Sequence, residues 1–161
     1  MWSDMKAIGK LICSVSVCLL TGFVGSFSTM DSVRTWYADL SKPSFNPPGW
    51  VFGVVWPILY VMMGIAAFLI WSKGVGSRQT RVALGLFMFQ LVLNGLWTPI
   101  FFGLHMMALA LAEIILLWVA ILATILAFRR ISKPAAYILI PYILWVSFAT
   151  VLNAALWHLN R

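Results

Sequence analysis

Aromatic and amide side chains recur at helical spacing in three separate apolar runs of this 161-residue chain. In each run a tryptophan or tyrosine lies three or four residues from a small or amide residue, so both fall on one face of a helix. The three sets are Gly53, Trp56, Tyr60 and Gly64; Gln90, Asn94, Trp97 and Phe101; and Tyr142, Trp145, Ala149 and Asn153. Flat rings beside a few amides can stack on a planar, largely apolar ligand and hydrogen-bond to its edge.

The same residue types also have purely structural uses in a membrane protein. Tryptophans gather at the bilayer interfaces, and Trp2 and Trp71 stand at the ends of apolar runs, where that use is expected. Trp56, Trp97 and Trp145 lie deeper in their runs, where either ligand contact or helix packing accounts for them. The amides can equally join helices by hydrogen bonds. Both interpretations stay open at the level of the sequence.

Conventional catalytic and metal-binding patterns do not occur in the sequence. It has no Ser/His/Asp set, no Gly-rich phosphate loop and no redox dithiol. Its two histidines, His105 and His158, have no second histidine or cysteine at ligand spacing, so we expect no metal site. Glu113 is the one acid well inside an apolar run. Because a charge there is costly, Glu113 is either functional or neutralised, by a partner such as His105 or by a proton.

The elements that must position these side chains follow from the composition. The chain is 63% hydrophobic and 9% charged, whereas about a quarter of the residues in a soluble domain are charged. Five apolar runs are long enough to cross a bilayer as helices. These runs cover residues 8–30, 51–71, 82–104, 106–128 and 135–157. We therefore predict an all-α membrane protein, with residues 1–161 forming a single five-transmembrane-helix bundle.

The positive charges predict the orientation of this bundle. The net charge of +7 is dispersed in short clusters between the apolar runs, which argues against nucleic-acid binding. Eight of the eleven Lys and Arg residues fall on one side of the membrane, namely Lys6, Lys10, Lys73, Arg78, Arg81, Arg129, Arg130 and Lys133. The positive-inside rule then predicts a cytoplasmic N-terminus, with residues 31–50 and the C-terminus outside, in the periplasm or the extracellular space of a bacterium.

The longest polar stretch, residues 31–50, is rich in prolines and aromatic residues. The prolines in Lys42-Pro43 and Asn46-Pro47-Pro48 allow the backbone few conformations, so the stretch is expected to form a stiff loop. With the predicted orientation, Trp56, Trp97 and Asn153 lie at similar depth directly beneath this loop. The sequence therefore predicts an aromatic pocket covered by a lid.

Three motifs in a fixed order carry a family resemblance. They are Trp36-Tyr37-x-x-Leu40-x-Lys42-Pro43-x-x-Asn46-Pro47-Pro48 followed by Trp56; Asn94-x-x-Trp97-Thr98-Pro99-x-Phe101-Phe102-Gly103; and Pro141-Tyr142-x-x-Trp145-x-x-x-Ala149-x-x-Leu152-Asn153. With them the chain resembles, over essentially its whole length, the tryptophan-rich sensory protein family. This is also called the translocator protein, or peripheral-type benzodiazepine receptor, family.

The resemblance implies a five-helix bundle, commonly a homodimer, that binds porphyrins such as protoporphyrin IX and haem as ligands and requires no cofactor. It also implies binding of synthetic isoquinoline- or benzodiazepine-type ligands. By position, the implied ligand pocket consists of Tyr37, Pro47, Trp56, Tyr60, Asn94, Trp97, Trp145 and Ala149, to which the helical faces add Asn153.

Two function classes follow from the resemblance. One is a tetrapyrrole sensor or translocator, and the other is an enzyme that degrades protoporphyrin IX with light and oxygen, with Trp56 and Trp145 as catalytic candidates. Cholesterol is not an expected ligand, because Trp157 precedes Arg161 without the tyrosine of the weak sterol-binding pattern.

A stripe of small residues runs along the first apolar run. Its members, at steps of four, are Ser14, Cys18, Gly22 and Ser26. Such a stripe lets helices approach closely, either between the two copies of a dimer or within one bundle.

Overall fold

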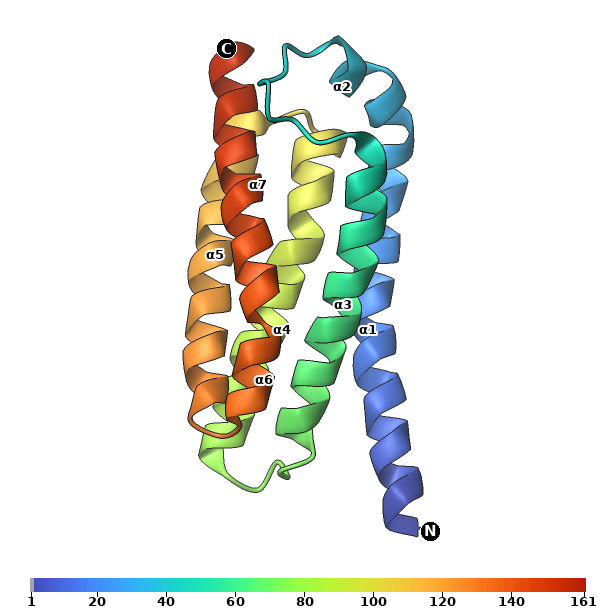
Figure 1. Ribbon diagram of the computed structural model, residues 1–161, viewed down its shortest axis with the longest axis vertical. Helices are drawn as coiled ribbons and strands as arrows, with labels where there is room; N and C mark the ends of the chain where they lie inside the picture. Colours follow the sequence, from blue (N-terminus) through green and yellow to red (C-terminus); the bar gives the residue numbers. More distant parts are fainter. Residues whose placement is uncertain (1) are drawn as a thin grey trace.

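The computed structural model describes residues 2–161, and the regular structure in that range is entirely helical. Five helical segments are long and apolar enough to cross a membrane, and they run side by side along the long axis (Figure 1). The elements are α1 (Trp2–Arg34), α2 (Trp36–Asp39), α3 (Gly49–Trp71), α4 (Arg78–Thr98), the π-helical turn η1 (Pro99–Gly103), α5 (Met107–Arg129), α6 (Lys133–Ile138) and α7 (Ile140–Leu159). The predicted five-helix membrane fold is confirmed.

Prolines explain where several of these helices break. Pro141 has no N–H to donate, so the helical hydrogen bonding is interrupted and the last crossing divides into α6 and α7 just before it. Pro99 opens η1, where its carbonyl accepts from the N–H of Leu104 at 2.9 Å. This bond spans five residues and widens the turn. Pro57 lies inside α3, which continues through it.

Helix α1 continues past the apolar run that predicts it. The run ends near residue 30, but α1 ends at Arg34 and the short helix α2 follows. The first proline of the chain is Pro43, so nothing in residues 31–34 prevents helical hydrogen bonding. The covering segment is therefore α2 together with residues 40–48, and we call residues 36–48 the lid.

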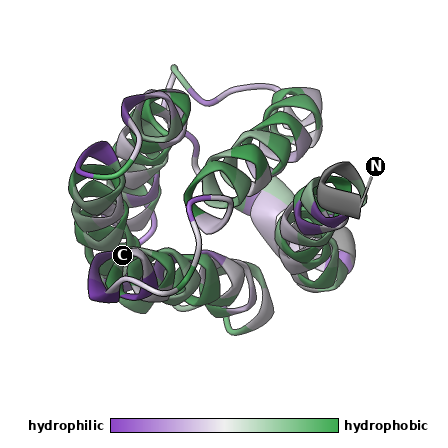
Figure 2. Cartoon of the chain, turned by 90° about the horizontal axis from the view of Figure 1, so that it is seen from below, coloured by the Kyte–Doolittle hydropathy of each residue, from purple (hydrophilic) through white to green (hydrophobic). Residues whose placement is uncertain are grey.

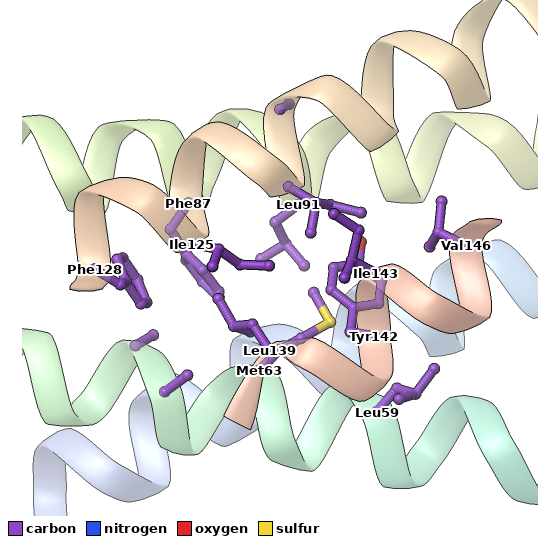
Figure 3. Packing of buried hydrophobic residues seen from close by; sticks show 14 of the residues in the cluster. Leu59, Met63, Phe87, Leu91, Ile125, Phe128, Leu139, Tyr142, Ile143 and Val146 are labelled. Atoms are coloured by element: carbon purple, nitrogen blue, oxygen red, sulfur yellow. The ribbon is translucent and has the colours of Figure 1, made fainter. Parts of the chain in front are cut away.

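The middle of the bundle and its half farther from the lid are filled by tightly packed apolar side chains. Leu59 and Met63 from α3 meet Phe87 and Leu91 from α4 and Tyr142 from α7 there, and each is less than a tenth exposed. Figure 3 shows side chains from these helices and from α5 pointing toward one another. Because lipid is as apolar as these residues, it is close packing that favours the assembled bundle.

The outward surface of the bundle is apolar as well. Viewed along the helices, most of the helical ribbon belongs to hydrophobic residues (Figure 2), and many large apolar side chains are exposed. On α1, for example, Ile12, Phe23 and Phe27 are about three-fifths exposed. Apolar side chains that point away from the core are those expected of a surface in contact with hydrocarbon.

Small residues bring α1 and α3 into close contact. A Cβ atom added to Gly64 would lie 2.5 Å from the Cα of Val15, and one added to Gly22 would overlap the ring of Tyr60. Cys18 is fully buried. Part of the small-residue stripe is thus used within one bundle, and its use between two copies stays a prediction.

Candidate functional site

The lid is held in shape by its own hydrogen bonds. The hydroxyl of Tyr37 donates to Asn46 Oδ1 at 2.8 Å, and the backbone N–H of Asn46 donates to the Pro43 carbonyl at 3.0 Å. The Lys42 ammonium donates to the Ala38 and Leu40 carbonyls and lies 5.0 Å from the centroid of the Tyr37 ring. Burial raises the pKa of Tyr37 above its usual 10.0, against the smaller lowering effect of Asn46. The phenol is therefore a neutral donor at physiological pH.

Contacts at two places fasten the lid region to the rest of the bundle. Near its start, Trp36 stacks on His105 with ring centroids 4.2 Å apart, and Ser32 Oγ donates to the Phe102 carbonyl at 2.6 Å. Near its middle, the side chain of Asn160 bonds to the backbone of Ser41. The lid thus runs from the end of α1 to the C-terminal end of the chain and back to α3 (Figure 1).

Beneath the start of the lid, aromatic rings gather around Phe101 of η1, which is only 1% exposed. Its ring centroid is 5.0 Å from that of Trp97, 5.6 Å from that of Trp36 and 6.4 Å from that of Tyr37. Phe102 adjoins Phe101 at 4.9 Å. The wide turn that Pro99 begins directs both phenylalanines toward the lid.

A second group of rings links α3 to α7. The ring of Phe52 lies 5.7 Å from that of Trp145, which in turn lies 5.5 Å from Phe148. Phe45 of the lid reaches Phe148 at 6.3 Å. The indole Nε1 of Trp145 is buried and has no hydrogen-bond partner among the residues that the structure describes. A buried donor without an acceptor costs about 1–3 kcal/mol, so an acceptor supplied by a ligand would be favoured here.

These two ring groups together form what we call the aromatic cluster. Its members are Trp36, Tyr37, Phe45, Phe52, Trp97, Phe101, Phe102, Trp145 and Phe148. Helix α6 packs against both α3 and α5, whereas α7 packs chiefly against α5 and little against α3. The contact of Phe52 with Trp145 therefore links α3 to α7 on the lid side of the bundle.

The amide side chains beneath the cluster join helices. Asn94 accepts from the Tyr60 hydroxyl at 2.6 Å and donates to the Tyr142 hydroxyl at 3.0 Å. Tyr142 in turn donates to Gln90 Oε1 at 2.8 Å. In this structure the Oδ1 and Nδ2 atoms of Asn94 both form hydrogen bonds to side chains of other helices. This is the helix-joining role that the sequence allowed as an alternative to ligand contact.

Asn153 plays the same part closer to the lid. Its Oδ1 accepts from the Trp97 indole at 3.2 Å, and its Nδ2 donates to the Met107 carbonyl at 3.0 Å. This bond places Trp97 and Asn153 next to each other, and their predicted common depth with Trp56 stays a prediction. Direct ligand contact by these amides stays a prediction.

The remaining predicted site residues are distributed over three places. Trp56 lies beside Tyr60 with ring centroids 5.6 Å apart, Pro47 is half-buried in the lid, and Ala149 is buried in the main core. The structure thus assembles Tyr37 and Trp97 around Phe101, with Trp145 in the neighbouring group. Trp56 contacts Tyr60, whose hydroxyl donates to Asn94 in the hydrogen-bonded group between the helices.

Phe52 and Phe148 were not among the predicted site residues. Phe52 precedes Trp56 by four positions, and Phe148 follows Trp145 by three. The three- or four-residue spacing that was used to choose the tryptophans therefore also places both phenylalanines on the same helical faces, and it could have predicted them.

Glu113 lies in α5 and is 9% exposed. Its two carboxyl oxygens have no hydrogen-bond partner among the described residues. His105 instead faces Trp36 and Ser32 at the lid end of the bundle. The suggested pairing of Glu113 with His105 is therefore not formed. No group of three or more His, Cys, Asp or Glu residues that could hold a metal ion occurs in the described part of the chain.

The fold and these contacts define an integral, multi-pass helical membrane protein with a lid over an aromatic cluster. The model of the TspO/MBR family matches residues 14–158. The chain belongs to this family.

Relatives from distant organisms are similar over most of their length. The tryptophan-rich protein TspO of Chlorobaculum tepidum is 43% identical over 96% of this chain and 98% of its own. The human translocator protein is 43% identical over 86% of this chain and 83% of its own. The tryptophan-rich sensory protein of Cereibacter sphaeroides is 42% identical over 78% and 77%, respectively.

Proposed function

We propose that this protein binds a tetrapyrrole such as protoporphyrin IX or haem beneath the lid, and acts as a sensor or translocator for it. The single observation that carries the proposal is the buried indole N–H of Trp145, which finds no acceptor in the described part of the chain and lies among rings that bridge α3 and α7. A porphyrin offers a large aromatic face for the rings and polar edge groups for this donor. The names of the relatives, translocator and sensory protein, agree with this class of function.

The binding test uses purified protein and protoporphyrin IX. Quenching of tryptophan fluorescence should saturate as porphyrin is added, and Trp145→Phe should weaken binding because it keeps a ring but removes the N–H donor. The matched control is Trp71→Phe at the opposite end of α3, where the indole lies 5.6 Å from Lys10 Nζ. Absence of saturable quenching, or equal losses in the two variants, would contradict the proposal.

A second candidate function is light- and oxygen-dependent degradation of protoporphyrin IX. It is favoured by Trp56 and Trp145, two half-buried indoles on the facing helices α3 and α7. With light and dioxygen, porphyrin absorbance should fall faster with the protein than with the Trp56→Phe/Trp145→Phe variant. Equal loss in both samples would indicate ordinary photobleaching and leave the sensor or translocator function.

We also propose that the N-terminus lies in the cytoplasm and the lid outside. The support is the clustering of basic residues at the end of the bundle opposite the lid, in residues 72–81 and 129–133, which comprise two connections and the adjoining helix ends. Alkaline phosphatase, which is active only outside the cytoplasm, should be active when fused at Arg161 and inactive when fused within residues 73–76. The reverse pattern would reject this orientation.

A further inference from the structure

A hollow of about 370 Å³ lies between the start of α4 and the end of α5, at the end of the bundle away from the lid. Arg78 and Gln79 of α4 line it together with Arg130, which follows the last residue of α5. Val82 and Ala127 supply its apolar part. The hollow therefore combines two cationic groups with a hydrocarbon wall.

The charges around this hollow have one sign. None of its lining residues is acidic. Among the acids whose side chains the structure describes, Asp31 and Asp39 belong to the lid end, and Glu113 lies several turns away within α5. Arg81 is used differently, because its guanidinium donates to the Val75 and Gly76 carbonyls at 3.1 and 2.9 Å. Among the described residues, the two arginines that line the hollow thus have no carboxylate beside them.

The apolar part of the hollow limits the kind of anion. Val82 is 52% exposed and, like Ala127, lies within a segment long and apolar enough to cross the membrane. An occupant must therefore place hydrocarbon against these residues and a negative group between the guanidiniums. A phospholipid has this construction, since its phosphate lies directly above its acyl chains. Guanidinium groups also match phosphate oxygens in a two-point geometry.

From this geometry we propose that the hollow is a binding site for an anionic phospholipid, with Arg78 and Arg130 holding the headgroup and Val82 and Ala127 contacting an acyl chain. The site lies at the opposite end of the bundle from the lid and does not depend on the tetrapyrrole proposal. A lipid bound there would lie in the groove between α4 and α5 at the bilayer surface.

Native mass spectrometry of the detergent-solubilised protein tests the proposal, with dioleoyl phosphatidylglycerol and dioleoyl phosphatidylcholine as probes. The wild type should retain phosphatidylglycerol in preference to phosphatidylcholine. Arg78→Gln/Arg130→Gln should weaken that binding about tenfold or more, as expected when two cations near a headgroup are lost. Lys133→Gln removes a charge at the same end but outside the hollow, and it should change the affinity by no more than about twofold.

A further variant separates the hollow from surface charge in general. Val82→Phe leaves both arginines in place but fills the apolar part, so it should also reduce phosphatidylglycerol binding. Equal binding of the two lipids would overturn the proposal, as would equal effects of the arginine and lysine variants or wild-type binding by Val82→Phe. Inorganic phosphate that binds as tightly as the lipid would likewise overturn it.

Discussion

The side-chain amide of Asn160 forms hydrogen bonds with both the N–H and the carbonyl of Ser41. Its Oδ1 accepts from the Ser41 N–H at 2.9 Å, and its Nδ2 donates to the Ser41 carbonyl at 2.9 Å. The same Nδ2 also donates to the Leu156 carbonyl at 2.8 Å, which fixes the amide on the last turn of α7. One residue next to the C-terminus thus links the middle of the lid to the bundle.

Asn160→Ala should loosen the lid without unfolding the protein. The substitution removes two hydrogen bonds worth about 1 kcal/mol each, so the open fraction of the lid should rise by about thirtyfold. Hydrogen–deuterium exchange should become faster in residues 40–46, and protoporphyrin IX should associate and dissociate faster if it enters past the lid. His158→Ala, on the same helix end, serves as the control and should leave lid exchange unchanged. Unaltered exchange in Asn160→Ala would show that other contacts hold the lid.

Tyr142→Phe should destabilise the whole bundle. The Tyr142 hydroxyl is fully buried, accepts from Asn94 and donates to Gln90, so its removal leaves buried amide groups without partners. The expected loss is about 1–3 kcal/mol, measured as a lower thermal transition temperature in detergent. Tyr137→Phe is the matched control, because Tyr137 is 60% exposed on α6. Equal transition temperatures for the two variants would mean that the network adds little to stability.

The sequence predicted the crossings because their apolar runs are long, and it predicted a stiff lid because prolines act locally on the backbone. It could not predict the Ser41–Asn160 contact, which joins residues 119 positions apart. The helical spacing also places Gly53 and Gly64 on one face of α3, and it could not show that only one of them packs against another helix. A Cβ on Gly64 would collide with α1, whereas one on Gly53 would meet nothing within 4 Å. Which neighbour a face meets depends on the packing of whole helices.

The lid should respond to alkaline pH through Tyr37. Burial raises the pKa of this phenol above 10.0 in the folded protein, so the folded state holds the proton more tightly than the unfolded state does. Its contribution to stability is therefore complete below pH 10.0 and falls as the pH rises through the raised pKa. The difference in ultraviolet tyrosinate titration between wild type and Tyr37→Phe should have its midpoint above 10.0. A midpoint at or below the usual value would contradict burial of the phenol beneath the lid.

Gly64→Ala and Gly53→Ala form a matched pair on α3 that tests how closely α1 approaches it. An added methyl group at Gly64 meets the backbone of Val15, which cannot turn aside as a flexible side chain can. Overpacking of this kind costs about 1–3 kcal/mol, so Gly64→Ala should lower the thermal transition temperature. At Gly53 the same methyl group enters open space, where alanine is favoured over glycine in a helix by about 1 kcal/mol. Gly53→Ala should therefore leave the transition temperature unchanged or raise it. Should both variants behave alike, α1 would have to pack against α3 less tightly than the structure has it.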